Sequence, residues 1–344
     1  MTIVSERLLP STTHGDEALD IVNGFRADLH DDTYVEQLDR EFPSYADYLG
    51  AYGVALMNLS DNDAGAFKWR GAAVGAAKLK EQGVQSIVAP SAGNHARGAA
   101  AAAKLLDMHL AVVVPSSAPP AKRDYIHGLS NSQHLQVQVV GATFDESLAW
   151  AQTLPGAMLH PYNNSDVIAG QGTIVDDLLA TQPDTQHIVL PVGGGGLLAG
   201  VLRRLDELQR TDITVHAAQA TGSNSLGNSL TARELTAAHN PNQRYGGSAV
   251  QTIGPLALRQ CLSSPNLRLL EVPNEDVDEL SELYAEDRKH LLRASTPNYE
   301  PTTLVAIAAL KQLQHLDSPV TVLGTGQNDT IHPPLARRTY RLPF

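Results

Sequence analysis

Short apolar runs alternate with longer Ala- and Leu-rich segments along most of the chain. The runs at 54–59, 86–89 and 110–114 are each followed by turn-forming residues such as Ser, Asp, Asn, Gly or Pro. The segments at 70–82 and 97–106 are longer and have helical composition and spacing. Strands that alternate with helices of this length are typical of βαβ units and parallel sheets. We therefore expect an α/β fold with a doubly wound parallel sheet.

The same alternation continues towards the C-terminus. Further strands are expected at 135–140, 187–191, 213–219 and 320–323, and further helices at 121–129, 145–154, 197–209, 277–292 and 302–313, with another ending near Leu179. Two regions are less regular. A short helix is expected near 35–41 with a break at Pro43, and residues 221–250 are expected to be rich in loops.

Composition narrows the possible partners and cellular settings. At 344 residues, with 42% hydrophobic and 18% charged residues, the chain is expected to form two domains. Its net charge of −12 argues against nucleic acid or an anionic membrane as a partner. The single cysteine, Cys261, excludes an intrachain disulfide. With neither a signal peptide nor an apolar run of about 20 residues recognisable, we expect a cytoplasmic protein.

Lys68 is the first candidate for chemistry, in the stretch Gly65-Ala-Phe-Lys-Trp-Arg-Gly-Ala-Ala73. A lysine at the start of a tightly packed helix can be desolvated, which lowers its pKa and makes its amine available for a Schiff base. Taken alone, Lys68 is better interpreted as an ordinary solvated lysine, because lysine is almost never buried.

Gly193–Gly196 form the second candidate, between an apolar strand and an apolar helix. Bare backbone amides beside a helix N-terminus can bind a phosphate, although a tight strand-to-helix turn is the alternative. Residues 194–199 also satisfy the dinucleotide pattern G-x-G-x-x-A. The dinucleotide pattern also requires an acidic residue about 20 positions later, at the end of the next strand. Here that strand ends in Gln219, so nicotinamide binding is disfavoured.

Other polar residues have simpler interpretations. The cluster His30-Asp-Asp32 could suggest a metal site, but no further ligands follow at useful spacing, so a solvated acidic loop is expected. Packing or surface roles are expected for Trp69, Trp150 and Cys261. His14, His109, His127, His134 and His216 have no partners at catalytic spacing.

Taken together, the Lys68 stretch, Ser91-Ala-Gly-Asn-His95 and Gly193–Gly196 resemble the fold-type II pyridoxal-phosphate (PLP) enzymes. The resemblance extends over about residues 65–328 and is greatest to the threonine/serine dehydratase and serine racemase branch. Further matches are Ile168-Ala-Gly-Gln-Gly-Thr173, the segment 247–254, Glu300-Pro301 and Thr325-Gly-Gln-Asn328.

The resemblance implies two doubly wound parallel-sheet domains with the cofactor between them. Residues 86–163 would be a small mobile domain, and residues 1–85 plus 164–344 a large PLP-binding domain. Lys68 would form the Schiff base, and a homodimer is implied. The implied cofactor-binding residues are Phe67, Lys68, Asn94, Gly193, Gly194, Gly195, Gly196, Leu197, Gly247, Glu300 and Thr325; Ser91, Ala92, Gly93 and His95 would face the substrate.

By the same resemblance, the implied reaction is β-elimination from a hydroxy-amino acid such as L-threonine or L-serine, giving a 2-oxo acid and ammonia. Ala92 stands where racemases of this branch have a second serine, which disfavours racemization. Alternatives are a β-replacement synthase, a specialised lyase of secondary metabolism, and a non-catalytic relative with the same fold.

Three departures from the family pattern qualify the prediction. Gln219 replaces a glutamate that helps to bind a divalent cation in this branch, so we expect no metal dependence. The segment 56–60 lacks the family's Lys and Glu, and Gly246 replaces an aspartate. These changes suggest a specialised substrate.

Overall fold

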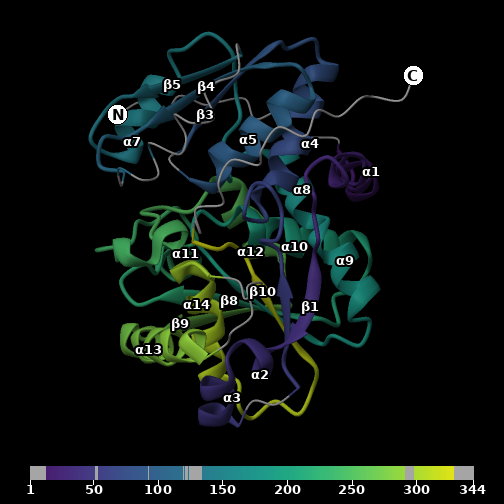
Figure 1. Cartoon of the computed structure of the whole chain (residues 1–344), viewed down its shortest axis with the longest axis vertical. Coiled ribbons are helices and arrows are strands. Elements are labelled where there is room, and N and C mark those ends of the chain that lie inside the picture. The colour runs from purple at the N-terminus through teal and green to yellow at the C-terminus, as the bar shows by residue number, and fades with distance from the viewer. Residues whose placement is uncertain are drawn as a thin grey trace.

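A computed structural model of the chain describes residues 13–50, 53–91, 93–118, 120, 123, 134–290 and 298–328. The described residues form two separate β-sheets (Figure 1). One has six strands in the order β1-β2-β10-β7-β8-β9, and the other has four in the order β5-β4-β3-β6. All neighbouring strands are parallel except β1 and β2. The predicted α/β fold with parallel sheets is confirmed.

The six-stranded sheet is built from short strands, of which the four inner ones are buried on both faces and the edge strands are partly exposed. Its strands are β1 (Tyr34–Gln37), β2 (Ala55–Asn58), β10 (Val320–Gly324), β7 (His187–Pro191), β8 (Thr214–Ala220) and β9 (Leu267–Val272). Successive side chains point to opposite faces. Within β7, Val189 therefore packs in one core cluster while Ile188 and Leu190 pack in the other.

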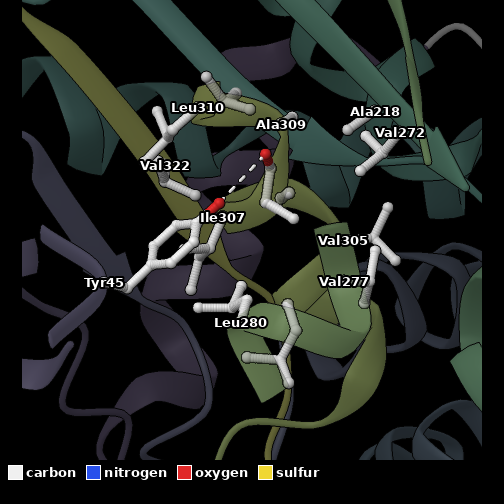
Figure 2. Packing of buried hydrophobic residues seen from close by; sticks show 14 of the residues in the cluster. Tyr45, Ala218, Val272, Val277, Leu280, Val305, Ile307, Ala309, Leu310 and Val322 are labelled. Atoms are coloured by element: carbon white, nitrogen blue, oxygen red, sulfur yellow. Dashed lines mark hydrogen bonds between the residues drawn. The ribbon is translucent and has the colours of Figure 1, made fainter. Parts of the chain in front are cut away.

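One face of this sheet is covered by four helices. They are α2 (Leu38–Glu41), α3 (Pro43–Leu49), α13 (Asn274–His290) and α14 (Pro301–Ala308). Figure 2 shows Tyr45 of α3 among Ile307, Leu310 and Val322. Its hydroxyl donates a hydrogen bond of 3.4 Å to the Ala308 carbonyl, so the polar end of this buried ring has a partner.

The opposite face is covered by a second group of helices. Side chains from α9 (Ile174–Thr181), α10 (Gly196–Glu207), α11 (Ser225–Ala232) and α12 (Pro255–Ser263) pack there. The helix α10 follows β7 directly and so begins at the carboxyl end of the sheet. In parallel sheets of this kind, ligands bind outside the carboxyl ends of the strands.

The four-stranded sheet takes all its strands from residues 86–158. They are β3 (Ser86–Pro90), β4 (His109–Val114), β5 (Leu135–Val139) and β6 (Ala157–Met158). Its main core cluster includes residues of α4 (Lys68–Glu81), α5 (Asn94–Leu105) and α8 (Ser165–Gly172). Another cluster includes Ala151 of α7 (Phe144–Ala151). The helices α4 and α8 lie outside 86–163, and the division into domains stays a prediction.

Glycines let three helices pack backbone to backbone between the two sheets, with α8 against both α4 and α10 (Figure 1). A Cβ atom built on Gly170 would lie 2.6 Å from the Arg70 carbonyl oxygen. One built on Gly172 would lie 2.8 Å from the Gly200 carbonyl oxygen. The segment matched as Ile168-Ala-Gly-Gln-Gly-Thr173 therefore joins the lysine helix to the helix after the glycine loop.

Several sequence predictions were wrong in detail. Residues 35–41 are not one helix: Tyr34–Gln37 is a strand, because it pairs with the buried strand β2, and only Leu38–Glu41 is helical. Pro43 starts α3 instead of breaking the chain, and proline suits the first position of a helix. The loop-rich region 221–250 also contains α11.

Other elements were not predicted at all. They include α1 (Gly15–Arg26), β6, α12 and β9. The apolar residues Ala18, Ile21, Val22 and Phe25 of α1 have helical spacing and pack in the cluster that contains Trp69 and Val74 of α4, so the amphipathic pattern was present in the sequence and was missed. The helix expected at 121–129 lies outside the described residues apart from position 123. No helix among the described residues is both long and apolar enough to cross a membrane.

The close contact between Gly170 of α8 and the backbone of α4 predicts that a larger side chain at position 170 destabilises the protein. We expect Gly170→Ala to lower the free energy of unfolding by about 1–3 kcal/mol, because a Cβ there forces the two helices apart. Gly24→Ala in α1 is the matched control. Nothing lies within 4 Å of a Cβ at this exposed position, so it should be neutral or stabilising. Urea unfolding of both variants would measure the difference, and equal effects would contradict the packing argument.

Candidate active site

Lys68 is the first residue of α4 and the centre of the candidate site. Its side chain is partly accessible but lies deep among protein atoms, and this desolvation lowers the pKa of Lys68 to about 8. The Glu300 carboxylate opposes part of this shift. The lysine Nζ is 4.3 Å from the centroid of the Phe67 ring. The lysine therefore has the weakened basicity that a nucleophilic amine needs.

Backbone hydrogen bonds join the loop before Lys68 to the segment after β10. The amide of Phe67 donates to the Thr325 carbonyl at 3.1 Å, and the amide of Gln327 donates to the Gly65 carbonyl at 3.3 Å. Ala66 and Gly326 form an antiparallel bridge between these bonds. Gly65 has φ of +67°, a value that favours glycine. The positions of Lys68 and Thr325 are thus fixed relative to each other.

Asn94 and Glu300 meet beside this bridge. The Asn94 side-chain amide donates to Glu300 Oε2 at 3.2 Å, and the Glu300 backbone amide donates to the Gly326 carbonyl at 3.0 Å. A Cβ on Gly326 would lie 2.4 Å from Glu300 Oε1 and 3.1 Å from Asn94 Nδ2. Glycine at 326 therefore leaves the space in which these two side chains converge.

The glycine loop has the form expected of a phosphate site. Gly195 has φ of +85° and precedes α10, whose first residue is Gly196. In the described part of the chain, the amides of Gly194, Gly195, Gly196 and Leu197 donate no hydrogen bond to the protein. Free amides at the N-terminus of a helix suit an anion, so these residues fit the phosphate of PLP.

Surrounding atoms leave no room for side chains on this loop. A Cβ on Gly193 would lie 2.1 Å from the Gly247 carbonyl oxygen, so Gly247 contacts the loop through its backbone. A Cβ on Gly194 or Gly196 would collide with Tyr162, at 2.3 Å and 2.9 Å. Tyr162, which follows His160-Pro161, was not among the predicted site residues. The Tyr162 ring packs against the loop, and this contact joins residues more than 30 positions apart, which no local pattern shows.

The loop after β3 is placed beside α5, as expected, but His95 differs from the prediction. Ser91 Oγ accepts the Gly93 amide at 3.2 Å, and α5 begins at Asn94. The His95 imidazole is buried and its Nε2 bonds to the Leu159 carbonyl at 2.7 Å. Burial lowers the pKa of His95 to about 3, so the ring is neutral and Nε2 carries the proton that it donates. Ala92 lies outside the described residues.

A buried ion-pair network follows Lys68 and was not predicted. Arg70 is 0% exposed, with its guanidinium 3.1 Å from Asp31 and 2.6 Å from Asp177. Arg26 of α1 also pairs with Asp177. The expectation of a solvated acidic loop at 30–32 was wrong for Asp31, whose side chain is 1% exposed. The spacing of residues in the sequence could not reveal this ion-pair network, because its charges come from three distant segments.

Both polar atoms of the Gln219 side chain form hydrogen bonds within the protein. Its Nε2 donates to the Val192 carbonyl at 3.3 Å, and its Oε1 accepts the Leu226 amide at 3.0 Å and the Gly227 amide at 3.4 Å. Among the described residues, no three His, Cys, Asp or Glu side chains are grouped as metal ligands. Independence from metal stays a prediction.

Three residues have the packing or surface positions that were expected of them. Trp69 is fully buried, Trp150 is exposed, and Cys261 is buried in α12. Burial raises the pKa of the Cys261 thiol to about 12, so it carries no thiolate near neutral pH. His216 does have a partner, since its Nε2 lies 3.0 Å from His187 Nδ1, but this pair is at the opposite end of the strands.

Comparison with known proteins identifies the class. Residues 41–326 match the model of the family described as "Pyridoxal-phosphate dependent enzyme". The chain belongs to this family, and it is a PLP-dependent enzyme. The residues above fit that cofactor: Lys68 would supply the amine, and the free glycine-loop amides suit its phosphate.

The names of similar proteins support the assignment of the chain to the threonine/serine dehydratase branch. The chain is 35% identical over 177 residues to a catabolic L-threonine dehydratase TdcB of Staphylococcus aureus, covering 50% of each protein. It is 42% identical over 144 residues to an L-threonine ammonia-lyase of Thermotoga maritima, covering 40% of this chain and 34% of the relative. The chain thus spans half or less of the length of these curated relatives.

Solved structures confirm the fold. Maize serine racemase has a TM-score of 0.75 at 22% identity, covering 93% of this chain and 95% of the other. Threonine deaminase isoform 2 of Solanum lycopersicum has a TM-score of 0.73 at 23% identity, covering 96% and 91%. Both similarities concern the fold alone.

The lowered pKa of Lys68 predicts how the apoprotein takes up PLP. Only the neutral amine attacks the aldehyde, so the rate should rise with pH and level off above about 8, well below the range of a solvated lysine. Stopped-flow absorbance would measure this rate from pH 6 to 10. A midpoint near 10 would contradict the desolvated site.

Matched variants identify the lysine responsible. After borohydride reduction, intact-protein mass should show one covalently bound cofactor in the wild type and in Lys104→Ala, which removes an exposed lysine. Lys68→Ala should show none. Retained covalent cofactor in Lys68→Ala would place the attachment elsewhere.

Proposed function

We propose that this protein catalyses β-elimination from a hydroxy-amino acid such as L-threonine or L-serine, releasing a 2-oxo acid and ammonia. The observation that carries the proposal is the fixed pairing of a desolvated Lys68 with Thr325, a neutral hydroxyl, across the Ala66–Gly326 bridge. Relatives named as L-threonine dehydratase and L-threonine ammonia-lyase support the reaction type.

Each proposed role follows from the chemistry of a side chain. The amides of Gly193, Gly194, Gly195, Gly196 and Leu197 would hold the phosphate, and Phe67 would pack beside the ring. Asn94, itself held by Glu300, would bind the ring oxygen. Thr325 would stand next to the ring nitrogen. When bound, the cofactor supplies an electron sink for charge that develops at the substrate α-carbon.

Lys68 is the proposed base. Because its pKa is lowered to about 8, the neutral fraction of its amine near neutral pH is far larger than that of a solvated lysine, and the neutral amine can take the α-proton. The substrate carboxylate would lie at the N-terminus of α5, near the Ser91 hydroxyl and the backbone of Gly93 and His95. Because the His95 imidazole is bonded to Leu159, its contribution would come from the backbone amide.

We also infer the larger arrangement from the family resemblance. Residues 86–163 would move as a small domain against the remainder, with the cofactor between them, and all four strands of the smaller sheet lie within that range. A homodimer and a cytoplasmic location are proposed on the same basis. Light scattering would test the dimer.

A substrate panel tests the proposed reaction. Purified holoenzyme should release 2-oxobutanoate from L-threonine or pyruvate from L-serine, together with equal ammonia. Lys68→Ala should lower kcat at least about 10³-fold, because it removes both the cofactor's attachment and the base. O-phosphoserine, 3-hydroxyaspartate and diaminopropionate would test a specialised substrate.

Two results would contradict elimination. Product formation only in the presence of an added thiol or other nucleophile would indicate β-replacement. Bound cofactor with no turnover of any panel member would indicate a non-catalytic relative.

A further inference from the structure

Thr303 lies behind Thr325 and is completely buried. It belongs to the first turn of α14, three residues after Glu300, and its side chain is 0% exposed. Its Oγ1 accepts the Thr325 amide at 3.1 Å and the Gly326 amide at 3.4 Å. The same oxygen lies 3.2 Å from Thr325 Oγ1 and 3.3 Å from the Gly326 carbonyl oxygen.

The number of donors and acceptors around Thr303 determines which hydroxyl can donate in its contact with Thr325. A threonine hydroxyl has one proton to donate and two lone pairs to accept with. Both lone pairs of Thr303 are taken by the amides of Thr325 and Gly326, so it cannot accept the Thr325 hydroxyl proton. Thr303 can only donate, either to Thr325 Oγ1 or to the Gly326 carbonyl. In both cases the Thr325 proton must point away from Thr303.

The Thr325 proton then needs an acceptor elsewhere. Thr325 is 1% exposed, and among the described residues Thr303 is the only hydrogen-bond partner of its hydroxyl. An aromatic ring nitrogen without a proton is such an acceptor. A protonated ring nitrogen is a donor, and it would leave the buried Thr325 proton unsatisfied, which is costly.

We propose that Thr303 is a positioning residue that makes Thr325 a hydrogen-bond donor towards the cofactor and thereby keeps the ring nitrogen unprotonated. The proposal rests on the proposed placement of Thr325 beside that nitrogen. When Thr303 donates to Thr325, the chain of donors runs from the Thr325 and Gly326 amides to Thr303, then to Thr325, then to the ring. Each bond polarises the next, which strengthens the last one.

The consequence for the reaction is selectivity. An unprotonated ring is the milder electron sink, so negative charge at the α-carbon is short-lived and expulsion of the β-substituent competes well with return of the proton. A protonated ring would favour proton return, which yields racemization or transamination. Thr303 would therefore act on the outcome of the reaction without touching substrate or cofactor.

The direct test is the ¹⁵N NMR shift of the ring nitrogen in holoenzyme loaded with ring-labelled PLP. In the wild type the shift should have the unprotonated value and stay constant from pH 6 to 9. Thr303→Val removes the directing hydroxyl while keeping the shape of the side chain. Its shift should move towards the protonated value and become pH-dependent. Thr303→Ser should restore the wild-type shift.

A second readout follows the products. In Thr303→Val, the ratio of racemization plus transamination to elimination should rise about tenfold, the effect of leaving one buried donor without its fixed partner. Thr302→Val is the matched control, because the adjacent buried hydroxyl donates at 2.7 Å to the Tyr245 carbonyl instead. It should leave both the shift and the product ratio unchanged.

The outcomes separate this proposal from the proposed function. Wild-type protein that takes up no PLP would overturn both. Loaded Thr303→Val with the wild-type shift would overturn the role of Thr303 alone, as would an equal change in Thr302→Val. If Thr303→Val does not fold, as judged by circular dichroism, Thr303→Cys replaces it, and its weak thiol donor should move the shift in the same direction.

Discussion

The structure depends on the short backbone pairing between the loop before Lys68 and the segment after β10. The Phe67 amide and the Thr325 carbonyl are joined at 3.1 Å, although their residues are more than 250 positions apart in the sequence. This pairing places an amine-bearing residue and a hydroxyl-bearing residue on adjacent backbones. The positions of these two residues matter for catalysis, because misplacing a reacting group by about 1 Å can lower the rate strongly.

Close helix packing extends this constraint to the phosphate site. The helix α4 begins at Lys68, the helix α10 begins at the glycine loop, and α8 packs against both through glycines. The buried Arg70 adds charge pairs with Asp31 and Asp177 just after Lys68. Removing one partner of such a buried pair is strongly destabilising, since it leaves the other charge unpaired. Lys68 and the glycine loop, the two ends of the proposed cofactor site, are therefore held by one packed body.

The parts of the fold that depend on local pattern were predicted from the sequence. Apolar strands followed by helices gave the parallel sheets, and the glycines after 187–191 indicated an anion site. Sequence patterns failed where a distant partner decides the structure. Tyr34–Gln37 is a strand because β2 lies beside it, and Asp31 is buried because Arg70 reaches it from α4. The Thr303 contacts likewise join two segments that no local motif connects.

The measurement that tests the account most directly is a crystal structure of the borohydride-reduced holoenzyme. We expect the cofactor bonded to Lys68 Nζ, its phosphate on the amides of Gly194–Leu197, and its ring nitrogen within hydrogen-bond distance of Thr325 Oγ1. A phosphate bound away from the glycine loop, or a ring nitrogen facing a group other than Thr325, would contradict the account.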